Sequence, residues 1–352
     1  MRIAMISTPF LSVPPHDYGG TELVVYELVE GLLDRGHDVT LFATGDSRTR
    51  ARLRALYPAP QWPPGPFTDL NHISWAMAHA ASGGFDVVHA HSAVALATGR
   101  LIPQVPLVYT IHHTQNEALS GYYRHFSRVE YVAISGDQAR REPGVERCAV
   151  VHHGLDVRRY HWTEHPDGYV CFLARFAPEK GVHTAIDVAA RAGVPIRVAG
   201  EVHPPNLDYY HAEVEPRLGL PHVTYLGCVG NDRKVPLLRD ARALLAPIDW
   251  NEPFGLMFIE AMLSGCPVVT FGRGSVPEIV EHGVTGFIAR SAEEMAQLIR
   301  PGGPVDRLDR GRIRAHAMRR FSRDRMAADY ERVYLAAAGR GRPGDWRPFT
   351  AA

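Results

Sequence analysis

The chain has 352 residues, of which 45% are hydrophobic, and this length exceeds what one compact core usually holds. Lys plus Arg equals Asp plus Glu at 38 each, so there is no overall basic field of the kind that holds a protein on nucleic acid. These numbers predict two domains and argue against a nucleic-acid partner.

The N-terminal segment "MRIAMISTPF" is predicted to be the first buried strand, because its apolar run is too short for a signal peptide or a membrane span. The cysteines lie far apart and form no Cys-x-x-Cys pair, which is typical of reduced thiols rather than of a zinc site or a disulfide framework. Both features lead us to expect a cytoplasmic protein. The four cysteines are Cys148, Cys171, Cys228 and Cys266.

In the first half of the chain, short apolar runs alternate with longer helical patterns, which is typical of a parallel sheet wrapped by helices. Between the first two runs, Leu23, Val24 and Leu28 recur at helical spacing, and Gly36 ends the predicted helix. The strand candidates are residues 2–7, 38–43, 86–91, 106–111, 131–135 and 148–153.

The segment "SRTRARLRALY", residues 47–57, has a short basic amphipathic pattern. Leu53, Leu56 and Tyr57 share an arc at helical spacing and are flanked by arginines. We expect a helix that packs on its own sheet and keeps its arginine face in solvent. A peripheral membrane contact stays open here but is not favoured.

The alternating pattern restarts after a polar, turn-rich segment at residues 154–168. The strand candidates of the second half are residues 169–174, 195–200, 222–227, 241–247 and 267–271. We therefore predict two doubly wound parallel-sheet α/β domains, residues 1–165 and 166–321. A C-terminal helix at about 322–338 could pack back on the first domain, and residues 339–352 are expected to be a flexible tail. Because open parallel sheets bind ligands at the carboxyl ends of their strands, function should be sought in the loops that follow strands.

The first such loop is "YGGTE", residues 18–22, which precedes the first helix. Gly19 and Gly20 would let backbone N–H groups approach an anion at the positive end of the helix dipole. A tight turn that needs a positive φ is the alternative interpretation.

The segment "ARFAPEKG", residues 174–181, is a stronger candidate for an anion site. Arg175 directly follows an apolar strand and Lys180 comes five residues later, so both cations could reach a diphosphate at the strand end. All but two of the basic residues are Arg, the exceptions being Lys180 and Lys234. This rarity argues against a merely solvated charged turn at Lys180.

The stretch "EPFGLMFIEA", residues 252–261, places two glutamates eight positions apart. Glu252 lies in the predicted loop before a helix, and Glu260 lies on that helix. The two carboxylates could accept hydrogen bonds from two hydroxylated rings, as a nucleoside diphosphate sugar would require. On spacing alone, a glutamate that serves the helix dipole and an unrelated glutamate on the helix surface explain the pattern as well.

Taken together, these motifs resemble the retaining glycosyltransferases of family 4. The resemblance covers nearly the whole chain. It implies the GT-B fold, in which two Rossmann-like domains face each other across an interdomain cleft, and transfer of a hexose-type sugar from a nucleoside diphosphate sugar to an acceptor hydroxyl. The segments that carry it are "YGGTE", "DVVHAHS", "TIHH", "AISGDQ", "HHGLDVRRY", "ARFAPEKG", "YLG", "EPFGLMFIEAMLSGCPVV" and "VPEIVEHGVTGFI".

The resemblance also implies a role for each candidate residue. Glu252 would hold the donor sugar with the backbone of Phe254, Gly255 and Leu256, and Glu260 would bind the ribose. The diphosphate would be bound by Arg175 and Lys180, with Gly19 and Gly20 completing the anion site. The base would lie near Gly227, Cys228 and Val229 and be contacted mainly by backbone.

In "TIHH", the family pattern of a threonine two residues before a functional histidine maps onto Thr110 and His112. That histidine would lie under the donor sugar and stabilise positive charge at the anomeric carbon, although the adjacent His113 blurs the assignment. His152 and His153 replace a more usual asparagine, which leaves the role of that loop open. No carboxylate or cysteine stands at metal-ligand spacing from the histidine pairs, so we expect a metal-independent site without a cofactor.

Two other functions fit part of the sequence. A nucleotide-sugar 2-epimerase shares the fold and the donor cleft, and a non-catalytic sugar-nucleotide-binding protein would keep the pocket without transfer. Retention would require the acceptor to attack from the same face as the leaving diphosphate. The sequence does not identify the acceptor, the oligomeric state, or whether the donor is a UDP-, GDP- or ADP-sugar.

Overall fold

A computed structural model describes all residues except 18, 146–147 and 340–352. The chain divides into two compact units. The first contains Met1–Leu155 and the segment that begins at Ser322, and the second is Asp156–Phe321. Apart from Gly339, the predicted flexible tail lies outside the described residues.

The first unit is built on a parallel sheet. Its described residues form seven strands in the order β3-β2-β1-β4-β5-β6-β7. The strands are β1 (Arg2–Ile6), β2 (Asp38–Phe42), β3 (Arg52–Arg54), β4 (Val87–Ala90), β5 (Leu107–Thr110), β6 (Glu130–Ala133) and β7 (Cys148–Val150). The helices are α1 (Gly20–Asp34), α2 (Thr68–Ser82), α3 (Val94–Gly99), α4 (Glu117–Tyr123), α5 (Gly136–Arg141) and α14 (Arg323–Ala337).

The N-terminal segment forms a central strand of this sheet, as its sequence predicts. Residues 3–6 of β1 are all fully buried, and β1 pairs with β2 on one side and with β4 on the other. A strand covered by helices on both faces needs apolar side chains on both, which explains why this run does not alternate with polar residues.

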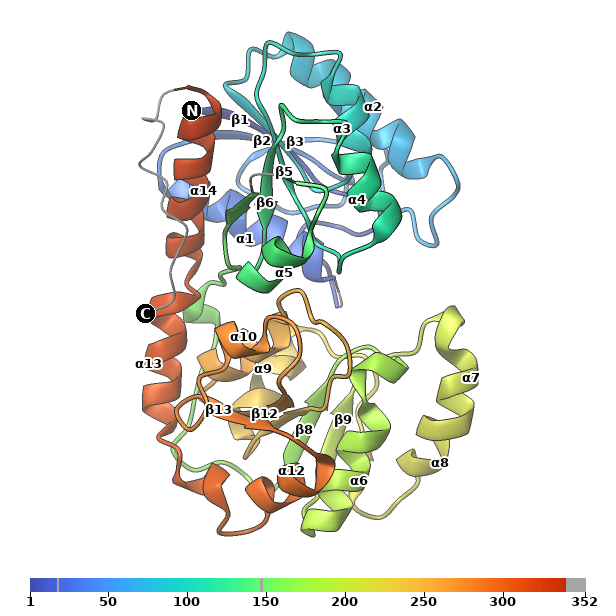
Figure 1. Cartoon of the computed structure of the whole chain (residues 1–352), viewed down its shortest axis with the longest axis vertical. Coiled ribbons are helices and arrows are strands. Elements are labelled where there is room, and N and C mark those ends of the chain that lie inside the picture. The colour runs from blue at the N-terminus through green and yellow to red at the C-terminus, as the bar shows by residue number, and fades with distance from the viewer. Residues whose placement is uncertain (18, 146–147, 340–352) are drawn as a thin grey trace. The chain divides into compact units, whose positions relative to one another are not determined.

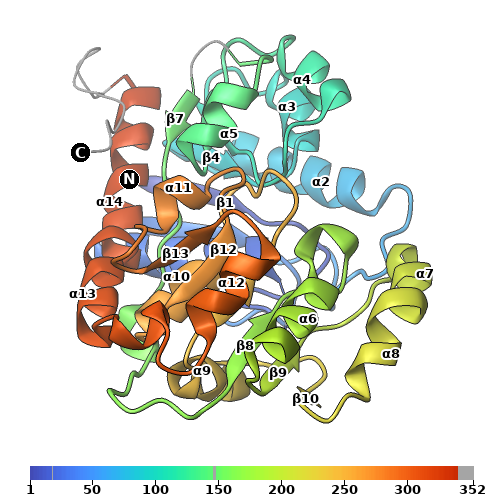
Figure 2. The same cartoon turned by 60° about the horizontal axis from the view of Figure 1, so that its bottom comes forward.

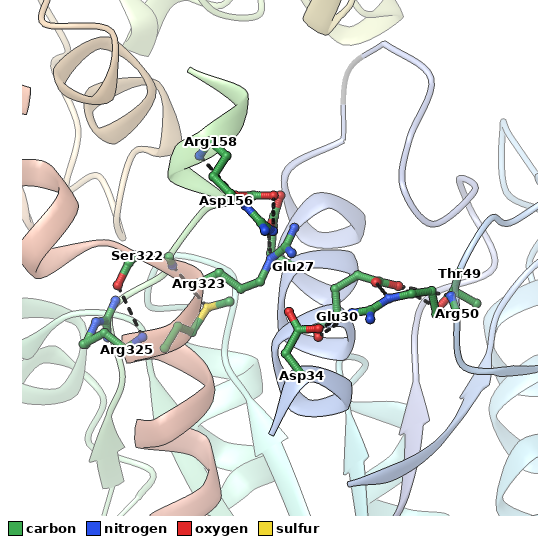
Figure 3. Close-up of polar contacts among 12 residues, drawn as sticks. Glu27, Glu30, Asp34, Thr49, Arg50, Asp156, Arg158, Ser322, Arg323 and Arg325 are labelled. Atoms are coloured by element: carbon green, nitrogen blue, oxygen red, sulfur yellow. Dashed lines mark hydrogen bonds and ion pairs between the residues drawn. The ribbon is translucent and has the colours of Figure 1, made fainter. Parts of the chain in front are cut away.

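The prediction of a helix over residues 47–57 is wrong, because this segment contains the edge strand β3 instead. Arg52 and Arg54 are exposed and Leu53 is half-buried between them, which is the two-residue alternation of a strand. β3 pairs in parallel with β2. Just before it, Arg50 is bound to Glu30 and to Asp34 of α1 (Figure 3). A basic amphipathic helix is therefore not available here for a membrane contact.

The C-terminal helix α14 packs against α1, with which it runs side by side in Figure 1. Arg323 Nε donates to Glu27 Oε2 at 2.6 Å, and both side chains are buried (Figure 3). Gly31 of α1 permits this close approach, because a Cβ atom there would lie 2.9 Å from both Ala327 and Arg323. A chain segment that follows the whole second unit thus belongs to the first.

The second unit contains a second parallel sheet. Its described strands follow the order β10-β9-β8-β11-β12-β13. They are β8 (Val170–Leu173), β9 (Ile196–Ala199), β10 (Val223–Tyr225), β11 (Leu244–Ala246), β12 (Val268–Phe271) and β13 (Gly286–Ala289). The last of these was not predicted from the sequence.

Helices cover the second sheet, and Figure 2 shows α6 and α12, which pack on each other, side by side over its strands. The helices are α6 (Val182–Ala192), α7 (Leu207–Tyr209), α8 (Glu215–Leu218), α9 (Asn231–Asp240), α10 (Leu256–Leu263), α11 (Val276–Ile279), α12 (Ala292–Ile299) and α13 (Arg310–Arg320). The two units therefore have the doubly wound, Rossmann-like architecture that the sequence predicts.

The boundary between the units lies earlier than the predicted position after residue 165. Residues 156–165 pack on the second unit through their backbone. Arg314 Nη1 donates to the carbonyl of Tyr160 at 2.8 Å, and Arg310 Nε donates to the carbonyl of Thr163 at 2.7 Å. The polar, turn-rich segment that indicated a linker is thus attached to the second unit by arginines of α13.

Candidate active site

In the second unit, Arg175 and Lys180 lie in the segment between β8 and α6. Pro178–Lys180 form one turn of 3-10 helix, and Gly181 follows with a φ of 71°. A Cβ atom on Gly181 would lie 2.3 Å from the carbonyl oxygen of Pro247, so only glycine fits this turn. The turn directs Lys180 inward, where it is 8% exposed.

Lys180 and Glu252 form a buried ion pair. Lys180 Nζ lies 2.6 Å from Glu252 Oε2 and 4.4 Å from the centre of the Trp250 ring. Trp250 Nε1 also donates to Glu252 Oε2 at 2.9 Å. Burial of a charge is costly unless it is paired, and here the ammonium, the carboxylate and the indole satisfy one another. The predicted phosphate ligand and the predicted sugar ligand therefore meet in one cluster.

The loop that carries Glu252 is held by close backbone contacts. Ser275 N donates to the carbonyl of Glu252 at 2.9 Å, and Ser275 Oγ donates to the carbonyl of Phe254 at 3.0 Å. Gly255 has a φ of 82° and precedes α10, whose first residue is Leu256. The start of α10 thus lies four residues after Glu252, and the N–H groups of helix N-termini attract anionic or hydroxylated ligands.

Glu260 forms a second buried pair, with the other lysine of the chain. Lys234 Nζ lies 2.5 Å from Glu260 Oε1, and Tyr160 Oη donates to the same oxygen at 3.3 Å. Lys234 belongs to α9. Since α10 begins at Leu256, Glu260 lies about one turn into the helix.

Sequence reasoning missed Lys234, Trp250 and Tyr160 as members of this site. One signal for Lys234 was present, because a chain that otherwise uses Arg keeps a lysine at that position. The Lys ammonium is a compact point charge, whereas the Arg guanidinium is a planar fork, so a retained lysine indicates a position that uses the smaller cation. Tyr160 and Trp250 gave no sequence signal, since aromatic residues are common in cores.

The predicted base-binding loop, Gly227 to Val229, lies between β10 and α9. Gly227 has a φ of 71° and its carbonyl accepts a hydrogen bond from Gly200 N at 2.9 Å. Cys228 is exposed, and Val229 is buried. The loop therefore offers mainly backbone to a ligand, and it leads directly into the helix that carries Lys234.

Arg175 has spare hydrogen-bonding capacity. Its Nη2 donates to Glu179 Oε1 at 3.2 Å, whereas its buried Nε has no hydrogen-bond partner among the described residues. A buried unpaired guanidinium N–H is unfavourable, and an anionic ligand would satisfy it. Arg175 and Lys180 thus both follow β8, but they contact different glutamates.

In the first unit, His112 lies just beyond the carboxyl end of β5. Its Nε2 is 2.8 Å from His91 Nδ1, and its ring stacks against the ring of His153 with the centres 5.7 Å apart. The surrounding protein atoms lower the pKa of His112 to about 3, because burial disfavours the charged ring, and the neighbouring His113 adds to this effect. His112 is therefore a neutral imidazole at physiological pH.

His113 is held by contacts of its own. Its Nε2 lies 2.6 Å from the hydroxyl of Tyr123, and its Nδ1 lies 2.7 Å from the carbonyl of Thr114. Both ring nitrogens therefore have hydrogen-bond partners within the first unit. The two histidines therefore differ in their ring contacts, and the sequence alone did not show this difference.

Gly19 and Gly20 lie where α1 begins, in the segment that follows β1. Gly19 precedes the first helical residue, and no side chain caps the helix. A Cβ atom on Gly19 would lie 2.8 Å from both Leu11 and Pro15. Close packing against the β1 loop is thus one reason for glycine here. In the first turn, Glu22 Oε1 accepts a hydrogen bond from Thr8 at 2.5 Å, and burial raises the pKa of Glu22.

Two further features of the described residues concern metal binding and the crossing of a membrane. In the described residues, no group of three or more His, Cys, Asp and Glu side chains is arranged so that it could hold a metal ion. Among the helices of that same part of the chain, none is both long and apolar enough to cross a membrane.

Known proteins resemble the chain over nearly its full length. The family described as Glycosyltransferase Family 4 matches residues 18–159, and the family described as Glycosyl transferases group 1 matches residues 159–300. Glycogen synthase of Mycobacterium tuberculosis is 27% identical over 96% of this chain and 95% of its own. Phosphatidyl-myo-inositol mannosyltransferase of the same organism is 26% identical over 97% and 98%.

Among solved structures, HepE of Anabaena in complex with UDP and glucose superposes with a TM-score of 0.74. It is 21% identical, and the match covers 96% of this chain and 100% of HepE. At this identity the likeness establishes the fold, and it agrees with the two parallel sheets described above.

Proposed function

The chain belongs to the family 4 and group 1 glycosyltransferases, and we propose that it transfers a hexose-type sugar from a nucleoside diphosphate sugar to an acceptor hydroxyl with retention of anomeric configuration. One observation carries the proposal. Both lysines of the chain are buried, and each pairs with one of the two glutamates spaced eight residues apart. All four lie in segments that follow strands of the second sheet, where open α/β sheets bind their ligands.

The two buried pairs would bind two different parts of the donor, the sugar and the ribose. Glu252 is oriented by Lys180 and Trp250, so it can accept hydrogen bonds from sugar hydroxyls. Glu260 is held in the same way by Lys234 and Tyr160, and we assign it to the ribose hydroxyls. The base would lie against the Gly227–Val229 backbone. This arrangement supports a nucleotide sugar as the donor.

The diphosphate would be bound by Arg175 and Lys180, with the start of α1 at Gly20 as a further anion contact. Arg175 supports this assignment because its Nε lacks a partner. During transfer, the bond between the anomeric carbon and the diphosphate oxygen breaks, and a bond forms from the acceptor oxygen to that carbon. The acceptor proton passes to the departing phosphate oxygen. Cations that stabilise charge on the leaving group contribute several kcal/mol to catalysis of this kind.

His112 would act on the donor sugar. As a neutral ring it adds no repulsion to positive charge that develops at the anomeric carbon, whereas an imidazolium would. A neutral imidazole is also a poor substitute for a carboxylate nucleophile. Same-face attack without a covalent sugar–enzyme intermediate therefore fits this side chain best, and neither a metal ion nor a cofactor is part of the proposed reaction.

The donor nucleotide and the location of the protein are also proposals. HepE was crystallised with UDP and glucose, which makes UDP-glucose the first donor to test here. The four cysteines lie far apart in the sequence and form no Cys-x-x-Cys pair, which supports a cytoplasmic location. We do not assign the acceptor.

Donor hydrolysis tests the proposal against its two alternatives. Purified protein is incubated with UDP-, GDP- and ADP-glucose without acceptor, and the products are followed by NMR. Slow release of free glucose with the nucleoside diphosphate is expected from a transferase. A 2-epimerase would instead convert the donor sugar to its C2 epimer, and a pure binding protein would release nothing while still binding the nucleotide.

A further inference from the structure

A buried hydrogen-bond chain connects the C-terminal helix α14 to β4 and to β5, and His112 follows β5. Tyr334 Oη lies 2.7 Å from His89 Nδ1, and His89 Nε2 lies 2.8 Å from Thr110 Oγ1. Tyr330 Oη completes the chain at 2.9 Å from the same threonine hydroxyl. Thr110 ends β5, two residues before His112, and all four side chains of this chain are fully buried.

His91 links this network to His112. The ring of His91 packs on that of His89 with the centres 4.3 Å apart, and its Nδ1 lies 2.8 Å from His112 Nε2. Its other nitrogen, Nε2, lies 3.2 Å from the sulfur of Met5 on β1. His91 is thus fixed from three sides, and only one of its contacts is with His112.

The sulfur contact determines which nitrogen of His91 carries the proton. A thioether sulfur can only accept a hydrogen bond, so His91 Nε2 is the protonated nitrogen. In a neutral ring, Nδ1 then has a free lone pair and must accept from His112 Nε2–H. His112, itself neutral, is left with an unprotonated Nδ1. This nitrogen can accept a hydrogen bond from a hydroxyl, and its lone pair is the electron-rich side of the ring.

We propose that His91 is a positioning residue that fixes the orientation and the tautomer of His112, and that the tyrosines of α14 hold His91 in place through His89. The proposal rests on the proposed function for the role of His112 in sugar transfer. It goes further by making a helix from the end of the chain part of the catalytic apparatus. His113 makes no contact of this kind, because both its nitrogens are engaged elsewhere.

The tautomer of His112 can be measured without any activity assay. In protein labelled with ¹⁵N at histidine, the ring nitrogen shifts of His112 are assigned by comparison with a His112→Gln variant. The proposal expects a neutral ring with the proton on Nε2. A proton on Nδ1 would overturn it whether or not the protein transfers sugar, whereas failure to use any donor would contradict only the proposed function.

Substitutions at His91 test the effect on catalysis. His91→Leu removes the acceptor for His112 Nε2–H, and we expect kcat to fall on the order of 10²-fold, as for other misplaced catalytic groups. The dissociation constant for the bare nucleotide should stay unchanged, because the residues assigned to the ribose and the base lie in the second unit. In His91→Asn the amide oxygen can take the place of Nδ1, so kcat should recover toward wild type and the His112 tautomer should be retained.

Tyr334→Phe tests the link to α14 with a smaller change than either His91 variant. It removes one of the two hydroxyls that contact the His89 ring, and kcat should fall while nucleotide binding is retained. The matched control is Tyr131→Phe, which also removes a buried hydroxyl in the first unit, one that donates to the carbonyl of Tyr123. Equal kcat in both tyrosine variants, with an unchanged His112 tautomer, would overturn the role of α14. Unchanged kcat and tautomer in a folded His91→Leu protein would overturn the role of His91.

Discussion

At the scale of single residues, the two lysine–glutamate pairs are the part of the account that mutation can test most directly. A buried ion pair gains little over an apolar pair, but removal of one partner leaves a buried charge without compensation, at a cost of about 3 to 5 kcal/mol. Both pairs are about nine-tenths buried, so this cost applies to them. Their presence is easier to explain by ligand binding than by stability.

Glu260→Ala should weaken binding of the bare nucleotide. The loss of a charged acceptor for ribose hydroxyls is expected to cost about 1.5 to 3 kcal/mol for each hydrogen bond. Calorimetric titration of the variant with UDP and with the other nucleoside diphosphates measures this loss.

A double substitution separates ribose binding from the damage of an unpaired Lys234. Glu260→Ala with Lys234→Met removes both charges, so it should regain much of the unfolding free energy lost in the single variant without regaining nucleotide affinity. If the double variant bound the nucleotide as tightly as wild type, Glu260 would be only a residue that pairs with Lys234.

Lys180→Arg should lower activity although the charge is kept. The ammonium contacts Glu252 and the face of Trp250, and a larger planar guanidinium would have to rearrange both contacts. Steady-state kinetics with the preferred donor are the measurement. Full activity in this variant would show that the phosphate site does not need a compact cation.

At the scale of secondary-structure elements, the glycine before α10 sets the direction of the helix that carries Glu260. Gly255 has a φ of 82°, and a Cβ atom there would lie 2.5 Å from the ring of Phe258. Gly283 has a similar φ of 78°, but a Cβ atom there would meet nothing within 4 Å. Alanine at either position would have a strained left-handed backbone. Only alanine at position 255 would also clash with a neighbouring side chain.

Gly255→Ala should therefore destabilise the protein more than Gly283→Ala. Left-handed backbone costs a non-glycine residue roughly 1 to 2 kcal/mol, and only the first variant adds displacement of Phe258. Urea unfolding compares the two, and nucleotide titration should show weaker binding for Gly255→Ala alone. Equal loss of stability and affinity in the two variants would mean that the contact with Phe258 has no role in shaping the site.

The ends of β4 and β5 carry histidines that fold in their neutral form. Burial lowers the pKa of His89 to about 3, and His112 next to it adds to the effect. In the unfolded chain the pKa of His89 is about 6.5, so below that pH the unfolded state binds more protons than the folded state. The stability contributed by neutral His89 is thus fully present above pH 6.5 and is lost as the pH falls toward 3.

His89→Gln should flatten this pH dependence. The amide can keep hydrogen bonds to Tyr334 and Thr110 but does not titrate, so the free energy of unfolding should fall less steeply between pH 6.5 and 4.5. The difference in slope is expected to approach about 1.4 kcal/mol per pH unit. Urea unfolding at several pH values measures it, and parallel slopes for wild type and variant would contradict a neutral buried His89.

At the scale of the whole molecule, the sequence predicted both Rossmann-like units, because parallel strands buried on two faces read as continuous apolar runs. It failed at β3, where three residues are too few to distinguish a strand period from a helix period and the arginines suggested a solvated helix face. It also failed at Lys234 and Tyr160, because their contacts with Glu260 join residues far apart in the chain. Hydrogen-bond partners at such separations have no local pattern, whereas the candidate loops follow strands and could be found.

The fold also makes α14 part of the first unit, where it contacts residues near His112. After the second unit, α14 returns to the first and reaches His89 and Thr110 with its tyrosines. Removal of this helix would expose apolar surface on α1 and leave buried polar groups unpaired. The C-terminal helix is therefore expected to be needed for activity as well as for folding of the first unit.

The stereochemistry of the product tests the central claim most directly. Purified protein is supplied with α-linked UDP-, GDP- and ADP-sugars and a panel of acceptors that includes small glycosides and isoprenoid phosphates, and the anomeric proton of the product is observed by NMR. Attack from the face of the leaving diphosphate predicts an α-linked product. A β-linked product would show attack from the opposite face with a protein base, and it would contradict the retaining mechanism while leaving the fold and the donor site intact.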